Sequence, residues 1–329
     1  MRWIRMFMLV ASAVPSIFPA HTLAQGGGKN IRIGIYSSGT FEQRAGQEGV
    51  LLQGLKEQGY VEGKNLQVER RYLSENFSVF PETAQELAGK GLDAIVTTCT
   101  GTTYLAKQAT SSIPIIMAGV SDPIGQKLIA SFARPGQNVT GLSSQSEDLL
   151  GKRLQLMADT MLRVTSVAVL ANSGNSVHDV AWKRLADAAK VRKIRLIKID
   201  VKSIDQVAAA FDAARRAGAQ AIFVLPDDPI LYNAHRRIVD LAAKQRMPDF
   251  YWTSDYVEDG GLMSYGESIR NSFHSAASYI VKVARGANPA EMPVEQPTQF
   301  ELVINLRTAK TLGIKIPEPI LLQATRVIE

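Results

Sequence analysis

The stretch LDAIVTTCTGTTYLAKQATSSIPIIMAGVSDPIG, residues 92–125, contains the pattern that decides the fold. Two apolar runs, at 92–98 and 113–120, flank a segment at 102–110 with helical spacing. Short apolar runs that end in small polar residues are typical of strands buried on both faces. A strand, a helix and a second strand in succession predict a parallel sheet covered by helices.

The same alternation extends to both sides of this stretch. Upstream, the apolar run IRIGIYS at 31–37 precedes a helical pattern that ends near Gly59. Downstream, we expect a helix over 124–133 and a strand over 139–144. A second series of helices and strands then begins at Ser146. The sequence therefore predicts two similar open α/β lobes, each of ordinary domain size.

The size and composition of the chain suit two globular lobes. Its 329 residues are 46% hydrophobic and 21% charged, which allows a sizeable core and argues against a disordered chain. Pro289, Pro293 and Pro297 indicate an extended crossover, so we expect the lobes to exchange segments. Cys99 is the only cysteine, so no intramolecular disulfide can form and the core must hold the fold.

Residues 1–24 have the pattern of a secretory signal. The segment begins with Arg2 and Arg5, continues as an apolar stretch over 6–19, and ends in small residues at Ala24. A membrane anchor is the alternative, but the apolar stretch is interrupted by prolines and is shorter than the roughly 20 residues that span a bilayer. We expect cleavage after Ala24 and a periplasmic protein that is not embedded in a membrane.

The charge pattern gives little support to a nucleic-acid partner. The formal net charge of +6 falls to +4 when the leader and its two arginines are removed. The remaining basic residues are scattered among acids, without the aromatic residues that accompany nucleic-acid binding. No histidine pair has metal-ligand spacing, and no glycine pattern fits a dinucleotide or phosphate loop. We therefore expect no metal, no cofactor and no nucleic acid.

The carboxyl ends of the predicted strands give the candidate ligand site. In an open parallel sheet these ends lie at one edge, where loops converge and helices begin with free N–H groups. The residues just past the strands are mostly hydroxyl, amide and carboxylate residues. The candidate ligand-binding set is Tyr36, Ser37, Ser38, Thr98, Thr100, Gly101, Thr102, Ser121, Asp122, Asn172, Asn175, Asp227, Asp228 and Asp255.

These residue types favour a zwitterionic ligand. Hydroxyl and amide N–H groups suit a carboxylate, and aspartates suit an ammonium group, so an amino acid would be paired at both ends. The alternative is structural, because Ser, Asp and Asn before a helix cap its free amides, worth about 1 kcal/mol each. The two roles are compatible. Asp122 and Asp228 are the sharper candidates, since each precedes a proline that can itself start the helix.

Cys99 provides the enzymatic alternative. A thiol at the start of a helix can have a lowered pKa and act as a nucleophile. His178, His235 and His274, its potential partners, lie within predicted helices, and a small loop residue is the simpler interpretation of Cys99. We therefore expect no catalytic residue and no enzyme.

Several longer blocks carry a resemblance to a known family. They are GLKEQGYVEGKNLQVERRY (54–72), IPIIMAGVSDPIGQKLIASFARPGQNVTGLSS (113–144), GKRLQLM (151–157), GGLMSYGESI (260–269), PVEQPTQFELVINLRTAKTLGIKIPEPIL (293–321) and ATRVIE (324–329). In order and spacing, these blocks resemble the ABC transporter substrate-binding protein family that includes tryptophan-type binding proteins. The match runs from about Ile31 to Glu329.

The resemblance implies a periplasmic-binding-protein fold of type I, with two Rossmann-like open parallel-sheet lobes joined by three hinge crossovers. It places the crossovers near Ser143, Thr253 and Val294. The first lobe would comprise 31–143 plus 254–293, and the second 144–253 plus 294–329. The implied partners are a small-molecule ligand, an ABC permease and its ATPase, and the protein is expected to be a monomer.

The resemblance also bears on the site residues. In members that bind aromatic amino acids, loops resembling Thr98 to Thr102 and Ser121-Asp122-Pro123 line the ligand site, and those resembling 172–175 and Asp227-Asp228 match in residue type. Cys99 and Pro229 depart from the family pattern, which leaves the ligand's identity open. The resemblance implies an exported receptor for an amino acid or related carboxylate. A sensing module for a signalling receptor and, further from the pattern, a Cys99-dependent enzyme are the alternatives.

Overall fold

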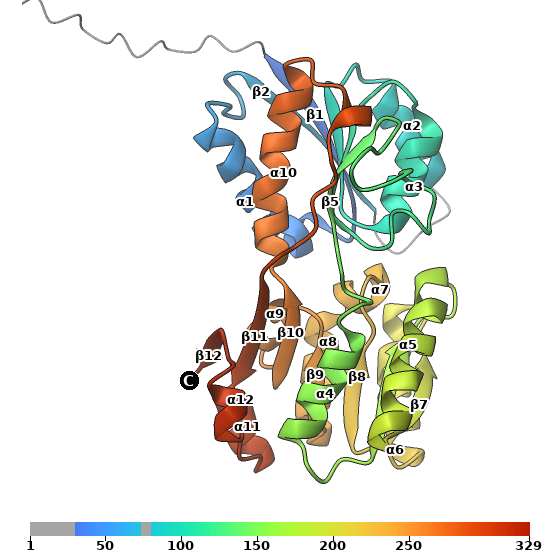
Figure 1. Cartoon of the computed structure of the whole chain (residues 1–329), viewed down its shortest axis with the longest axis vertical. Helices are drawn as coiled ribbons and strands as arrows, with labels where there is room; N and C mark the ends of the chain where they lie inside the picture. Colours follow the sequence, from blue (N-terminus) through green and yellow to red (C-terminus); the bar gives the residue numbers. More distant parts are fainter. Residues whose placement is uncertain (1–29, 74–79) are drawn as a thin grey trace, which may run out of the picture.

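The computed structural model describes residues 30–73 and 80–329 and contains two α/β lobes, one above the other in Figure 1. The leader expected at 1–24 lies outside the described residues. Each lobe has one open sheet, and every strand pairing in the two sheets is parallel except one. The α/β fold class with two open-sheet lobes is therefore confirmed.

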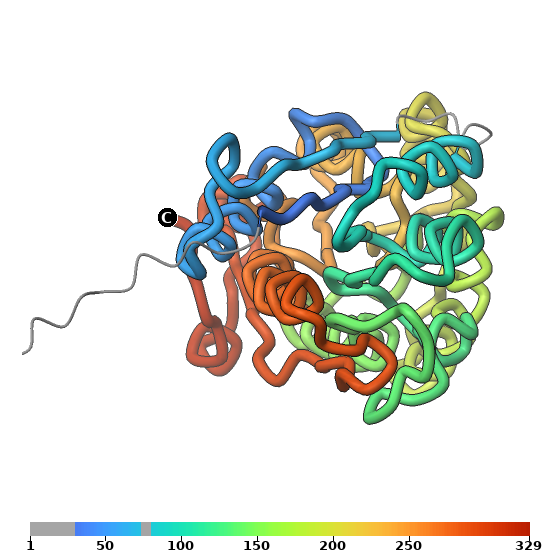
Figure 2. The backbone as a smooth tube through the Cα atoms, turned by 90° about the horizontal axis from the view of Figure 1, so that it is seen from above, coloured from blue at the N-terminus to red at the C-terminus, as the bar shows by residue number. Residues whose placement is uncertain are grey.

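The sheet of the first lobe has the order β2-β1-β3-β4-β5. Its strands are β1 (Ile31–Ser38), β2 (Leu66–Leu73), β3 (Ala94–Thr97), β4 (Ile115–Val120) and β5 (Val139–Ser143). One face is covered by α1 (Phe41–Glu57) and α10 (Ile269–Ala284), and the other by α2 (Phe80–Ala88) and α3 (Thr100–Ala109). Helix α10 lies beside α1 although more than 200 residues separate them in sequence (Figure 1, Figure 2).

The sheet of the second lobe has the order β12-β11-β10-β9-β8-β6-β7, with only β10 and β11 antiparallel. Its strands are β6 (Ser166–Ala171), β7 (Arg195–Asp200), β8 (Ala221–Val224), β9 (Asp249–Tyr251), β10 (Met263–Glu267), β11 (Phe300–Asn305) and β12 (Arg326–Ile328). Its helices are α4 (Leu150–Thr160), α5 (Ser176–Arg192), α6 (Val207–Arg216), α7 (Pro229–Asn233), α8 (His235–Gln245), α9 (Ser254–Glu258), α11 (Leu306–Leu312) and α12 (Glu318–Leu321).

The cores follow the two-residue period of the strands. In β6, Val167 and Val169 pack against one set of helices, while Ala168 and Leu170 pack against the other. All six residues of this strand are buried. A central parallel strand covered on both faces needs a continuous apolar run, which explains why the sequence pattern revealed these strands.

The chain passes between the lobes three times, and the second passage differs from the expected one. We expected it near Thr253, with 254–293 in the first lobe. Instead β10 pairs with β9 through Met263 and Phe250, and with β11 on its other edge, so the chain leaves the second lobe only after Glu267. The pairing of β10 with β11, which is distant in sequence, keeps 254–267 in the second lobe.

The other two passages lie close together at the edge of the first sheet. The chain leaves β5 after Ser143. The returning segment, before it enters the second lobe, forms a short parallel bridge between Glu295 and Leu142, in which Glu295 N donates to Gly141 O (3.0 Å) and Ser143 N donates to Glu295 O (2.8 Å). Two of the three connections are thus hydrogen-bonded to each other.

The helix expected over 124–133 is absent from the structure, and this segment consists of turns. Asp122 and Lys127 both have left-handed backbone, with φ of 42° and 56°, which interrupts a right-handed helix at each end of its first turn. Asp122 Oδ1 accepts from Gly125 N (3.0 Å) and closes this turn.

In residues 30–73 and 80–329, no helix is both long enough and apolar enough to span a bilayer.

Candidate ligand-binding site

Polar side chains converge between the lobes, at the carboxyl ends of the parallel strands. They surround a pocket with about 580 Å³ of empty space, part of which is open to solvent. The first lobe and the adjoining connections contribute Ser38, Arg44, Gln47, Thr98, Cys99, Ala118, Gly119, Ser121, Ser144, Ser146, Ile269, Ser272 and Phe273. The second lobe contributes Asp227, Asp228, Pro229, Tyr232, Trp252 and Glu267.

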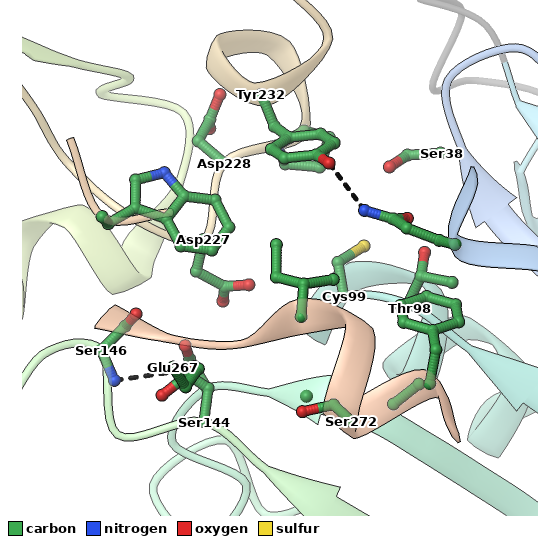
Figure 3. Close-up of a pocket in the computed structure, with 18 of the residues that line it drawn as sticks. Ser38, Thr98, Cys99, Ser144, Ser146, Asp227, Asp228, Tyr232, Glu267 and Ser272 are labelled. Carbon is green, nitrogen blue, oxygen red and sulfur yellow. Dashed lines mark hydrogen bonds between the residues drawn. The ribbon is translucent and has the colours of Figure 1, made fainter. Parts of the chain in front are cut away.

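The labelled side chains in Figure 3 divide into two groups across the pocket. Ser38, Thr98 and Cys99 lie on one side in this view, and Asp227 and Glu267 lie on the other. The first group comes from strand ends of the first lobe, and the second group from the loop after β8 and the end of β10 in the second lobe. A ligand in this pocket would touch both lobes at once.

Arg44 is a buried cation on the first-lobe side of the pocket. Thr40 and Gln43 form a capping box that begins α1, which places Arg44 in the first turn beside the end of β1. Its Nε donates to Ser38 O (2.7 Å) and its Nη2 to Ser38 Oγ (3.1 Å), and the guanidinium carbon lies 4.5 Å from the centre of the Tyr232 ring.

The acceptors around Arg44 are all neutral. Within the described residues no carboxylate lies within 4.0 Å of this guanidinium, and burial lowers the pKa of Arg44. A buried guanidinium without a counter-ion is costly unless a charged partner arrives. Arg44 is therefore suited to receive a ligand carboxylate.

Asp227 is the central carboxylate of the opposite side. Its backbone is left-handed, with φ of 56°, a conformation that Asp tolerates better than most residues. Thr100 Oγ1 of the other lobe donates to Asp227 Oδ2 (2.8 Å). Burial raises the pKa of Asp227 well above its ordinary value, and the nearby charge of Glu147 adds to the rise.

Two further carboxylates lie close to Asp227. Glu267, at the end of β10, accepts from Gln145 N (3.2 Å), and burial raises its pKa. Glu147, on the connection before α4, has a buried Oε1 without a hydrogen-bond partner among the described residues, and burial raises its pKa as well. The second-lobe side of the pocket is therefore rich in carboxylate oxygen and poor in donors.

Asp228 has a structural role beside the pocket. Its Oδ1 accepts from Leu231 N (2.9 Å), which caps α7, and its Oδ2 accepts from Asn172 Nδ2 (2.9 Å) and Asn175 Nδ2 (3.1 Å). Asn175 in turn caps α5 through Val177 N (3.1 Å). Asp228 and Asn175 thus cap helices, as the structural alternative predicted, and the network fixes the loops that carry Asp227.

His178 forms hydrogen bonds to both of these loops, the one at 172–175 and the one that carries Asp227. Its Nδ1 accepts from Asn172 N (2.8 Å), so Nε2 carries the proton and donates to Pro226 O (2.8 Å). The imidazole is completely buried, and burial lowers its pKa. A neutral imidazole is the form that this pair of bonds requires.

The predicted site residues fall into three groups in the structure. Those that line the pocket are Ser38, Thr98, Ser121, Asp227 and Asp228. Others line neighbouring pockets. An outer pocket that shares Asp227 is lined by Thr100, Gly101, Asn172 and Asn175. Asp122 lines a pocket beside the first connection, and Asp255 lines one on the far side of Tyr232.

Tyr36, Ser37 and Thr102 are completely buried and do not line the pocket. Tyr36 points into the core beneath α2, where its hydroxyl donates to Phe80 O (2.6 Å). The Thr102 hydroxyl donates to Cys99 O (3.1 Å) at the start of α3. The strand-end pattern cannot separate residues that face a ligand from neighbours that face the core, because successive strand residues point to opposite faces.

Cys99 lines the pocket as a buried thiol. Its Sγ lies 3.4 Å from Thr102 Oγ1, and burial together with the charge of Asp227 raises its pKa. A thiol with a raised pKa is a poor nucleophile at neutral pH. The geometry gives no support to the enzymatic alternative.

Sequence reasoning missed residues of three kinds. Ser144 and Ser146 follow β5, and Glu267 is the last residue of β10, so the same strand-end pattern was capable of finding them. Arg44 and Gln47 lie three residues apart on the first helix, a spacing that places both on one face. Tyr232, Trp252, Ser272 and Phe273 had no local signal, because only the packing of the lobes and of α10 brings them to the pocket.

The rims of the two lobes contact each other directly. Gln47 Nε2 donates to Tyr232 Oη (2.6 Å), Gln43 Nε2 donates to Asn233 O (3.1 Å), and Arg44 Nη2 donates to Asn233 Oδ1 (3.0 Å). With the bond from Thr100 to Asp227, these contacts close the cleft on two sides of the pocket. The structure is a closed conformation.

Two open α/β lobes, three connecting segments and a polar pocket between facing rims define a type I periplasmic-binding-protein fold. The family model described as ABC transporter substrate binding protein matches residues 41–328. The chain belongs to this family.

Similar proteins include members whose names or structures state a ligand. A tyrosine-binding protein of Clostridioides difficile (strain R20291) is 22% identical over 264 residues, which are 80% of this chain and 75% of that protein. A domain from Streptococcus pneumoniae in complex with L-Trp is 25% identical, with a TM-score of 0.83 over 91% of this chain and 100% of that chain. A conserved domain protein from Vibrio cholerae is 28% identical, with a TM-score of 0.84 over the same shares.

Proposed function

We propose that this protein is an exported receptor of an ABC importer that captures an amino acid, or a related small zwitterion, between its lobes. The observation that carries the proposal is the pairing of unlike charges across one pocket. Arg44 has no carboxylate partner, and Asp227 and Glu267 have no cationic partner, among the described residues. A zwitterion satisfies both sides at once.

The geometry orients the proposed ligand. Its carboxylate lies toward Arg44, Thr98 and the start of α3, where backbone N–H groups add positive potential. Its ammonium group lies toward Asp227 and Glu267. The ligand's two charges are thus paired with Arg44 on one side and with Asp227 and Glu267 on the other, while Asp228 keeps its capping contacts.

The remaining wall is suited to an apolar or aromatic side chain. Tyr232, Trp252 and Phe273 all line the pocket, and aromatic rings bind one another through large apolar area and favourable edge and face contacts. The tyrosine-binding and L-Trp-bound relatives support aromatic amino acids as the first ligands to test.

Closure follows from contacts made by both lobes. The connections after Ser143, after Glu267 and around Glu295 act as hinges, and the ligand bridges rims that separate when the cleft opens. A ligand drives closure only if it binds the closed form better, and contacts from both lobes provide that difference. The closed form is the one that a permease and its ATPase would recognise.

A thermal-shift series with matched compounds tests the ligand class. L-Tryptophan, L-tyrosine and L-phenylalanine carry both charges, tryptamine lacks the carboxylate, and N-acetyl-L-tryptophan lacks the ammonium group. A ligand at 100 times its Kd stabilises the folded state by about 2.7 kcal/mol, which raises Tm by about 4 °C for a chain of this size. We expect this rise with at least one zwitterion and a smaller one with the singly charged compounds. No response to any of a full panel of amino acids would reject the amino-acid assignment.

Substitution of Cys99 tests the absence of catalysis in the proposal. Cys99→Ser keeps a small polar side chain at the pocket wall, so the Kd for the ligand should change by less than about threefold. Incubation of the ligand with the parent protein, followed by mass spectrometry, should return it unaltered. Turnover that disappears in Cys99→Ser would replace the receptor by an enzyme.

A further inference from the structure

In the closed structure, Asp227 lies close to other carboxylates and has no cation beside it. Asp227 and Glu267 come from the second lobe, and Glu147 comes from the segment between the first connection and α4. None of the three forms an ion pair within the described residues. Asp227 receives one side-chain hydrogen bond, from Thr100, and Glu147 Oε1 is buried without any.

We propose that the closed site requires one positive charge beside Asp227, and that a proton on this carboxylate takes the place of the ligand's ammonium group when no ligand is bound. Acidification then closes the ligand-free protein and competes with ligand. This inference rests on the proposed function, in which Asp227 binds the ammonium group of the ligand.

The charged neighbours of Asp227 support this assignment. Asp228, which is saturated by three donors, and Tyr232 lie on its own segment, and Glu267 at the end of β10 and Glu147 before α4 lie nearby. Further groups around the pocket are Cys99 at the start of α3, Arg44 on α1, Arg153 on α4, His178 on α5, Lys202 after β7 and Asp122 after β4.

The cations in this set are engaged elsewhere. Arg153 is completely buried, with Nε donating to Tyr265 O (2.6 Å) and Nη1 to Ser146 O (2.6 Å). Arg44 donates to Ser38 and Asn233. Lys202 is exposed and lies 3.5 Å from Asp200. Arg153 still acts electrostatically on Glu147 and Glu267, whereas Asp227 has no cation to compensate it in the closed form.

The direction of the pH effect follows from linkage. The closed form, in which burial raises the pKa of Asp227, holds a proton that the open and solvated carboxylate has released. Between the ordinary carboxyl pKa near 4 and the raised one, falling pH therefore shifts the ligand-free protein toward closure. A bound ammonium group lowers the pKa again, so ligand binding in this range releases the proton.

The first experiment needs no ligand. The radius of gyration of the ligand-free protein is measured by small-angle X-ray scattering from pH 8 to pH 5, with circular dichroism to verify that it remains folded. We expect the radius to fall as the pH falls. Asp227→Asn, a neutral isostere of the protonated acid, should be compact across the whole range. Asp179→Asn removes an exposed carboxylate on α5 and should behave like the parent.

The second experiment measures competition, with L-tryptophan as the probe in calorimetric titrations. The affinity of the parent should fall on acidification by up to tenfold per pH unit, and that of Asp227→Asn should be weaker at pH 8 and independent of pH. A parent radius that does not change between pH 8 and pH 5, or one that changes equally in Asp227→Asn, overturns the inference while leaving ligand binding intact. If L-tryptophan and the other amino acids fail to bind but the acid-induced closure of the parent is lost in Asp227→Asn, the proton site stands and the ligand assignment fails.

Discussion

Arg44 and Asp227 act in opposite ways because their surroundings differ. Arg44 lies among neutral acceptors and under the Tyr232 ring, so it retains a free positive charge toward the pocket. Asp227 lies among other acids and a single hydroxyl donor, so its ionised form is disfavoured. One residue is poised for a carboxylate and the other for a cation, which is the basis of the proposed selectivity.

Replacement of Arg44 should distinguish recognition of the ligand's carboxylate from recognition of its ammonium group. Arg44→Gln removes the charge and keeps part of the hydrogen-bonding capacity. A charge-assisted hydrogen bond contributes about 1.5–3 kcal/mol, so the affinity for a zwitterion such as L-tryptophan should fall about 10- to 100-fold. Affinity for tryptamine, which has no carboxylate, should fall only by the roughly fivefold that loss of the Arg44–Asn233 rim bond costs. An equal loss for both compounds in calorimetric titrations would assign Arg44 to closure rather than to carboxylate recognition.

The buried carboxyl of Asp249 should make part of the free energy of unfolding depend on pH. This fully buried carboxyl accepts from Leu262 N (2.6 Å) and from Tyr251 OH (2.8 Å), and burial raises its pKa to about 7. The folded form therefore holds a proton between pH 4 and 7 that the unfolded form has released. The stability it contributes at acidic pH is lost as the pH rises through about 7.

The variant Asp249→Asn should remove this contribution. Measured by differential scanning calorimetry, the Tm of the variant relative to that of the parent should increase as the pH rises from 5 to 8. A difference that is constant with pH would show that Asp249 does not titrate in this range.

At the scale of elements, the packing of β10 against the segment after β9 depends on close approach of the two backbones. A Cβ at Gly266 would lie 1.9 Å from Trp252 O. Because this oxygen belongs to the backbone, the clash cannot be relieved by the movement of a side chain. Gly266 is next to Glu267, and Trp252 lines the pocket, so this approach sets the position of both. Glycine at 266 is thus required by packing between β10 and the segment after β9.

Two glycine substitutions should have opposite effects. Gly266→Ala should destabilise the protein by about 2 kcal/mol or more, because the clash is with backbone. Gly49→Ala, in the middle of α1 with no atom within 4 Å of the added Cβ, should stabilise it by about 0.5–1 kcal/mol. Chemical denaturation gives both values. If Gly266→Ala left the free energy of unfolding unchanged, β10 would be free to move relative to β9.

At the scale of the whole molecule, contacts between the rims stabilise closure even outside the pocket. Asn233 receives bonds from Gln43 and Arg44 of the other lobe and does not line the pocket. The free energy of these contacts adds to that of the ligand, because both exist only in the closed form. The affinity of the protein therefore depends on residues that do not touch the ligand.

Asn233→Ala should weaken ligand binding without altering the pocket wall. Loss of one hydrogen bond, about 1 kcal/mol, should lower the affinity about fivefold and increase the dissociation rate. Gln53→Ala, which removes an exposed amide on the same helix as Gln43, is the control and should bind like the parent. If stopped-flow fluorescence gave the same dissociation rate for all three proteins, the rim contacts would have no role in closure.

The sequence by itself determined the succession of strands and helices and the strand ends that carry the pocket loops. Buried parallel strands need continuous apolar runs, and the direction of the chain assigns their ends, so Ser38, Thr98, Ser121 and Asp227 were found from local pattern alone. The failed helix over 124–133 shows the limit of this approach, because a left-handed residue such as Lys127 leaves no clear mark on the apolar pattern.

Only the tertiary structure decided which strand ends face each other and where the chain changes lobe. The second passage follows Glu267 because β10 pairs with β11, and Phe273 reaches the pocket because α10 returns to the first lobe. Arg44 meets Asn233 and Tyr232 only when the lobes close. These contacts join segments that are far apart in sequence, and local periodicity carries no information about such pairings.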